Sequence, residues 1–81
     1  MDQNRLRWAS RRGMLELDLL LTTFVERGYA EAGPENQARF ELLLACEDQD
    51  LFGWLMGRTE APDADLRAIV AVVLDVCRAA P

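Results

Sequence analysis

Four arginines surround a tryptophan near the start of this chain, in the order Arg5, Arg7, Trp8, Arg11 and Arg12. A guanidinium group binds carboxylates and carbonyl oxygens in a fixed planar geometry, so such a cluster can recognise acidic or backbone groups of another molecule. Arginine and tryptophan are also enriched among the residues that supply most of the energy of protein–protein binding. The pattern therefore indicates a docking surface, with Arg12 placed to bind a carboxylate or a carbonyl.

Gly13 interrupts the helical pattern between this basic segment and an apolar segment that follows it. It either ends a first helix, where a positive φ costs glycine nothing, or keeps the backbone bare where another chain approaches closely. Trp8 likewise has two interpretations, as an anchor in or beside the core and as an amphipathic residue of a binding surface. Glu16 lies four residues after Arg12 and would pair with it if the turn stayed helical.

Catalytic and metal-binding arrangements are poorly represented in the sequence. There is no histidine, which excludes catalytic triads and dyads that use a histidine base. Cys46 and Cys77 do not form a C-x-x-C pair, so we expect no metal site and two reduced thiols that pack as small apolar residues. Glu47, Asp48 and Asp50 precede an expected helix, where acids are typical of caps. We therefore expect no enzymatic activity from this chain alone.

Charge is unevenly distributed along the chain, whose net charge is −5. Residues 1–13 carry four arginines and one acid, whereas residues 14–81 carry five arginines and thirteen acids. Nucleic-acid binding depends on neutralising phosphates, and most of this domain would repel them, so we expect no nucleic-acid partner. Two alternatives stay open: a small antitoxin-like or nucleic-acid-associated regulator that uses the basic N-terminal helix, and a structural scaffold with unrelated partners.

Apolar residues recur at helical spacing along most of the chain, which predicts a single all-α domain with no sheet. Asp2 or Asn4 can cap the first helix, and Asp63 can cap the last. The first residues are polar and the longest apolar run is short, so we expect a cytoplasmic protein without membrane insertion. The bundle of about five helices is predicted to comprise residues 3–12, 14–27, 34–46, 50–56 and 64–79.

Two segments resemble a known family of small proteins. Residues 12–16 match the Arg-Gly-x-x-Glu signature of the succinate dehydrogenase flavinylation (FAD assembly) factor family. Residues 48–57 are similar to that family's acidic-Leu-x-x-Trp-Leu-x-Gly segment, and Pro62 and a terminal helix follow them. The resemblance covers about residues 4–75. The extended presequence of mitochondrial members is absent, which favours a bacterial cytoplasmic member.

The resemblance implies a five-helix fold and a chaperone-like role in the assembly of a respiratory complex. Family members help the flavoprotein subunit of succinate dehydrogenase, and often its fumarate reductase relative, to acquire covalently attached FAD. The bond forms to a histidine of that subunit, so the chemistry belongs to the client and the factor binds no cofactor stably. A factor that binds its client transiently and orients it needs an interface and no catalytic group.

Partner binding is assigned to seven residues on this basis. Arg12, Gly13 and Glu16 carry over as the positions of the family motif, and the other four are added because they share a face with these three or lie near them. The predicted partner-binding set is Trp8, Arg11, Arg12, Gly13, Met14, Glu16 and Asp18. We expect Gly13→Arg to leave the fold nearly intact and to abolish client binding.

Overall fold

Helix caps and apolar spacing produce five α-helices in the computed structural model, which describes residues 1–79. The helices are α1 (Gln3–Ala9), α2 (Leu15–Arg27), α3 (Pro34–Leu44), α4 (Asp48–Leu55) and α5 (Ala64–Ala79). The described residues contain no β-strand, so the prediction of an all-α fold with about five helices is confirmed. A membrane crossing would need a longer and more apolar helix than any of these.

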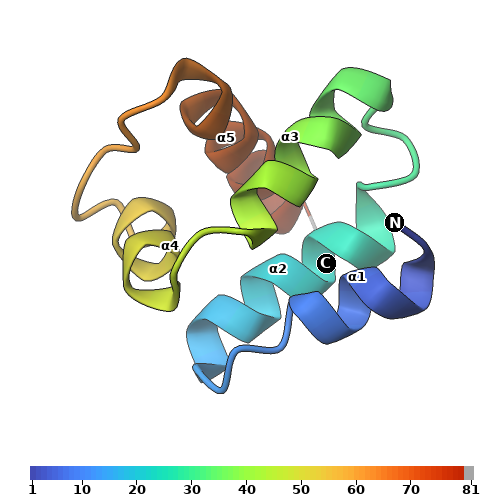
Figure 1. Ribbon diagram of the computed structural model, residues 1–81, viewed down its shortest axis with the longest axis horizontal. Coiled ribbons are helices and arrows are strands. Elements are labelled where there is room, and N and C mark those ends of the chain that lie inside the picture. Colours follow the sequence, from blue (N-terminus) through green and yellow to red (C-terminus); the bar gives the residue numbers. More distant parts are fainter. Residues whose placement is uncertain (80–81) are drawn as a thin grey trace.

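The core forms where α5 packs against α2 and α3, while α1 lies beside α2 at the edge of the molecule (Figure 1). Every helix contributes side chains that are fully buried, and each such side chain stabilises the fold by about 1.5–3 kcal/mol. These side chains are Leu6, Leu17, Leu21, Phe24, Phe40, Leu43, Leu51, Ile69 and Val73. Leu6 is the only buried residue of α1, so packing alone holds this helix weakly.

Three aromatic rings connect α2 with α3 inside the core. The ring centroids of Phe24 and Phe40 are 4.7 Å apart, and Tyr29 lies edge-on to both at 6.4 Å and 5.8 Å. The Tyr29 hydroxyl reaches Glu41 and donates a hydrogen bond of 3.1 Å to its carboxylate. This cluster closes the turn between α2 and α3 and fixes the angle at which the two helices meet.

The first helix ends three residues earlier than the predicted range of residues 3–12. Ser10 is its C-cap, and the Ser10 hydroxyl donates to the Leu6 carbonyl at 2.7 Å. The backbone N–H of Arg12 donates to the Asp18 carboxylate at 2.7 Å instead of to a helical carbonyl. Local side-chain bonds of this kind compete with helix continuation, and they explain why residues 10–14 form a connecting loop.

The other helix limits differ less from the prediction. The third helix ends at Leu44 rather than at residue 46, and the fourth runs from Asp48 to Leu55 rather than over residues 50–56. Asp2 and Asp63 cap their helices as expected, because each carboxylate accepts a backbone N–H of the following turn. Glu47 occupies the N-cap position of α4 without a side-chain cap bond, so the capping expected from the acids before this helix does not occur there.

Candidate functional site

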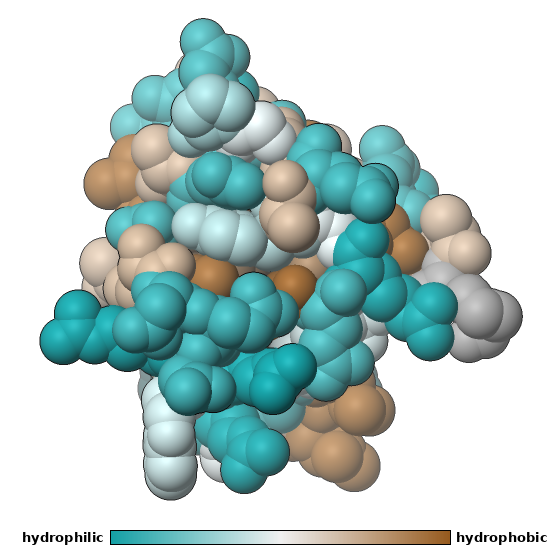
Figure 2. All heavy atoms as spheres, turned by 90° about the vertical axis from the view of Figure 1, so that its right-hand side faces the viewer, coloured by the Kyte–Doolittle hydropathy of each residue, from teal (hydrophilic) through white to brown (hydrophobic). Residues whose placement is uncertain are grey.

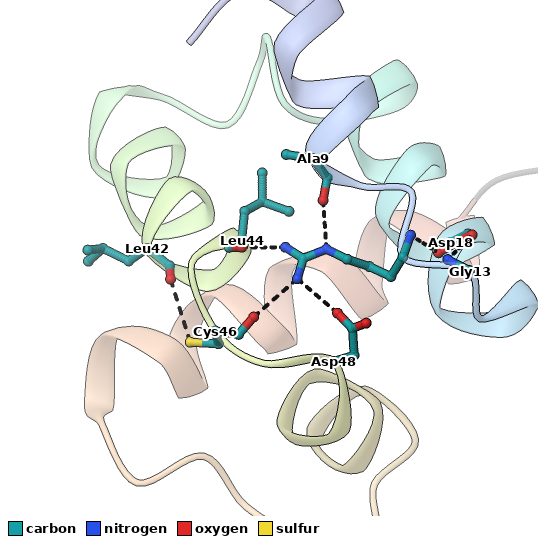
Figure 3. Close-up of polar contacts among 8 residues, drawn as sticks. Ala9, Gly13, Asp18, Leu42, Leu44, Cys46 and Asp48 are labelled. Atoms are coloured by element: carbon teal, nitrogen blue, oxygen red, sulfur yellow. Dashed lines mark hydrogen bonds and ion pairs between the residues drawn. The ribbon is translucent and has the colours of Figure 1, made fainter.

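Arg12 lies in the loop between α1 and α2, and its guanidinium reaches the end of α1 and the segment between α3 and α4, by the contacts that Figure 3 draws. Its Nε donates to the Ala9 carbonyl at 2.7 Å, and Nη1 donates to the Cys46 carbonyl at 3.1 Å. Nη1 also forms an ion pair of 3.0 Å with Asp48, and Nη2 donates to the Leu44 carbonyl. One side chain therefore joins the end of α1 to the corner between α3 and α4.

The position of this guanidinium follows from unsatisfied backbone groups. The last carbonyls of a helix have no partner within it, and the negative end of the helix dipole attracts a cation there. The Arg12 guanidinium supplies both a hydrogen-bond donor and a positive charge at the ends of α1 and α3. Its side chain is 15% exposed. The condition for a pair between Arg12 and Glu16, a helical turn, is not met, and Arg12 pairs with Asp48 instead.

Asp18 holds the same loop from its other side. Its two carboxylate oxygens accept the backbone N–H groups of Arg12, at 2.7 Å, and of Gly13, at 3.2 Å. Gly13 has a φ of +82°, which is strained for any residue with a Cβ atom. A Cβ atom built on Gly13 would meet nothing within 4 Å, so the backbone is bare on its outer side. The interpretation of Gly13 as the end of the first helix is wrong, because that helix ends at Ala9 with Ser10 as its C-cap, whereas the bare backbone agrees with the second interpretation.

The remaining predicted residues divide between surface and frame. Trp8 is 75% exposed, so its interpretation as a core anchor is wrong. Arg11 and Glu16 are also exposed, and Glu16 lies in the first turn of α2. Met14 is half-buried, packs against the core and serves as the N-cap of α2 without a side-chain bond. The predicted set therefore combines three outward-facing side chains with a bare glycine and three half-buried residues beside it.

Three residues outside the predicted set complete this surface. Leu15 and Leu19 are 75% and 57% exposed and line the same hollow, so together they form an exposed apolar patch of the kind found at interaction sites. Arg7 joins Arg11 and these two leucines in lining a hollow of about 380 Å³ between α1 and α2. Leu15 and Leu19 fall outside the core stripe of α2, the helically spaced apolar series that begins with Leu17, Leu20 and Leu21, and this is the signal in the sequence that could have found them.

The thiol of Cys46 lies beside the contacts of Arg12. Burial raises the pKa of its thiol above 9.0, the charge of Asp50 raises it further, and the Arg12 guanidinium opposes both effects. The thiol contacts the Leu42 carbonyl at 3.6 Å and remains free, as does Cys77. A protonated, partly buried thiol of this kind is a packing group and not a nucleophile.

The five-helix fold and this junction define a small all-α protein whose distinctive groups gather on one surface. Residues 4–77 match the family model described as "flavinator of succinate dehydrogenase", and the chain belongs to this family. A Pseudomonas aeruginosa protein named FAD assembly factor SdhE is 61% identical over 71 residues, covering 88% of this chain and 84% of that protein. A Shewanella oneidensis protein of the same name is 47% identical over 81 residues, covering 100% and 96%.

Proposed function

We propose that this chain promotes the covalent attachment of FAD to the flavoprotein subunit of succinate dehydrogenase, and that it binds this subunit through the junction between α1 and α2. The family description and the names of its relatives support the role in flavinylation. They fit a chaperone-like factor better than a catalyst, and the chain has no histidine that could act as a base. We assign the chemistry to the client and stable binding of FAD to the client alone.

The bare backbone at Gly13 carries the proposal for the site. The loop is held on one side by the contacts of the Arg12 side chain and on the other by Asp18. A loop fixed in this way presents Gly13 and Glu16 in a defined geometry, which limits the entropy lost when a partner binds. The partner can approach the Gly13 backbone closely because no side chain covers it.

The test is in-gel flavin fluorescence of the apo flavoprotein subunit after incubation with FAD, with and without this protein. We expect the wild type to increase covalent flavin and Gly13→Arg to lose this effect. Gly13→Ala imposes the same backbone strain without the bulk, at a cost of about 1–2 kcal/mol, and should retain most of the stimulation. Gly33→Arg is a second control, because Gly33 also has a positive φ and open space around it.

Failure of the wild type to stimulate a cognate client that can accept FAD would overturn the function itself. Equal loss of activity in Gly13→Ala, Gly33→Arg and Gly13→Arg would instead show that these substitutions act by disturbing the fold and not by blocking the interface. The same assay with the flavoprotein subunit of fumarate reductase tests the second client that we propose. Localisation in the bacterial cytoplasm, where such a client would be assembled, is part of the same proposal and is checked by cell fractionation.

A further inference from the structure

Three arginines of the N-terminal segment have no acidic partner among the described residues. Arg5, Arg7 and Arg11 are exposed, and within residues 1–79 no carboxylate forms an ion pair with them. Acids are nonetheless abundant in the chain, which has 14 of them against 9 arginines. Four other arginines do have such partners, namely Arg12, Arg39, Arg67 and Arg78. Arg27 and Arg58 also form no ion pair within this part of the chain, but they are isolated in the sequence, whereas Arg5, Arg7 and Arg11 fall within seven residues and leave a locally positive strip on an acidic protein.

Arg7 and Arg11 line two adjoining hollows of the surface. The larger one, of about 380 Å³, is walled on its far side by Leu15 and Leu19 of α2. The smaller one, of about 150 Å³, is lined by Trp8 together with both arginines. We call this surface, formed by these five residues, the arginine groove. In Figure 2, one group of apolar atoms lies at the lower right of a mostly hydrophilic face, and smaller groups lie at its left and centre.

We propose that the arginine groove holds an acidic segment of the client flavoprotein. Carboxylates of this segment pair with Arg7 and Arg11, and apolar side chains beside them cover Leu15, Leu19 and Trp8. The proposal rests on the proposed function and adds the chemistry that the client must present. Exposed aromatic and apolar groups next to arginines are the composition of binding hot spots, and the unpaired positive strip supplies the charge complementarity.

The acidic residues of α2 determine which side of the bound segment faces which helix. Asp18 and Glu26 line the wall that α2 forms, and both oxygens of Asp18 are already engaged by backbone N–H groups. Carboxylates of the client are therefore attracted to the α1 wall and repelled from the α2 wall, where Leu15 and Leu19 provide the contact area. The segment then lies with its acidic side on α1 and its apolar side on α2.

Two other occupants fit the groove less well. A two-fold contact with a second copy would offer the arginines only the acids of its own α2 wall, and both oxygens of Asp18 there are already engaged by backbone N–H groups. A nucleic acid would meet the acidic remainder of a chain whose isoelectric point is about 4.5. An acidic protein segment is attracted by the strip and is small enough to avoid the rest of the surface.

The proposed pairing of client carboxylates with Arg7 and Arg11 is tested by titration calorimetry. Binding of the apo flavoprotein subunit is measured at low salt and at about 0.3 M salt. We expect Arg7→Glu/Arg11→Glu to weaken binding by about tenfold or more at low salt, with a smaller difference at high salt. Arg58→Glu/Arg78→Glu makes the same change in net charge at exposed positions outside the groove. This control should bind within about twofold of the wild type.

The apolar half has its own matched pair of variants. Leu15→Ser/Leu19→Ser should also weaken binding by about tenfold or more, but with little dependence on salt. Leu42→Ser changes an equally exposed leucine of α3, at 56% exposure, and should bind like the wild type. Circular dichroism of each variant must show wild-type helix content, as expected for substitutions at exposed positions.

The outcomes separate this inference from the function on which it rests. If the wild type binds and stimulates flavinylation while Arg7→Glu/Arg11→Glu binds equally well, the groove is not the site of an acidic segment, although the function stands. If the wild type neither binds nor stimulates, the proposed function fails first. Self-association that the groove variants abolish, or RNA binding that they abolish, would assign the groove to one of the other occupants and overturn the inference.

Discussion

At the scale of single residues, the Arg12 guanidinium completes the ends of two helices that come from different parts of the chain. It donates to Ala9 at the end of α1 and to Leu44 and Cys46 at and beyond the end of α3, and it pairs with Asp48. Four of its five N–H groups are used in this way. Arg12 does bind carbonyls and a carboxylate, as its residue type indicated, but these groups belong to its own chain.

We predict that Arg12→Ala lowers the free energy of unfolding by about 2–4 kcal/mol. The substitution leaves partly buried carbonyls and one carboxylate without their partner, and each unpaired group carries a desolvation penalty. Urea denaturation followed by circular dichroism measures the change. Arg11→Ala is the matched control, because Arg11 is exposed and unpaired and its loss should change stability by less than about 0.5 kcal/mol. Equal stability of the two variants would show that the guanidinium does not hold the junction.

At the scale of elements, most of the fold could be predicted from the sequence because its causes are local. Apolar spacing identified five helices, and Asp2 and Asp63 marked two of their starts by capping rules that act within one turn. The loop at residues 10–14 could not be predicted in this way. Its shape depends on Asp18 and on contacts of Arg12 with residues 32 to 36 positions away, and no periodicity carries such information.

The candidate site shows the same division between local and distant causes. The family motif predicted that Gly13 and Glu16 belong to the binding surface, and the shared helix face predicted the same for Trp8; all three are exposed. The arginine groove was not predicted, because Arg7 becomes part of it only when α1 lies beside α2. Helical spacing showed which leucines of α2 fall outside the core stripe, but it did not show whether another helix covers them.

The contact between the end of α2 and α5 yields a prediction at this scale. A Cβ atom at Gly28 would lie 2.7 Å and 3.0 Å from the two methyl carbons of Val76, and 3.1 Å from the Phe24 ring. Valine in a helix has essentially one χ1 rotamer, so rotation cannot relieve the contact. Gly28→Ala should therefore lower the free energy of unfolding by about 1–3 kcal/mol. Thermal denaturation measures the loss, and adding Val76→Ala, which removes both methyl groups, should make the Gly28 substitution nearly neutral relative to Val76→Ala alone.

At the scale of the whole molecule, the well-packed part of the protein is mainly acidic and the weakly packed α1 is basic. The core of α2, α3 and α5 is surrounded by a mainly acidic surface, whereas α1 carries unpaired arginines and has one buried residue of its own. Arg12 and Asp18 supply the attachment that packing does not, because they tie the α1–α2 loop to both neighbouring elements. The least packed helix can therefore be the one that presents the docking surface without being free to move.

Stability should also respond to pH through the contact that closes the α2–α3 turn. The ammonium group of Met1 and the Tyr29 hydroxyl both bond to Glu41, and these hydrogen bonds lower the pKa of its carboxyl below 4.5. A lowered pKa means that the native state prefers the charged form, so this stabilisation is present above pH 4.5 and is lost as the pH falls through the native value. Burial, and then the bond to Glu41, raise the pKa of Tyr29 above 10.0, so the tyrosine contribution is present below that pH and is lost on the alkaline side.

We predict that Glu41→Gln lowers the free energy of unfolding at neutral pH and that the difference from the wild type closes as the pH falls below the lowered pKa of the Glu41 carboxyl. Below that pKa the wild-type carboxyl is itself neutral, so the two proteins present similar groups to Met1 and Tyr29. Urea unfolding curves across the acid range measure the difference. Glu35→Gln is the matched control, because Glu35 makes only a long surface ion pair of 3.8 Å with Arg39 and should show little difference at any pH. A Glu41→Gln deficit that stayed constant down to the acid end would assign the effect to packing or shape and not to the charge of this carboxyl.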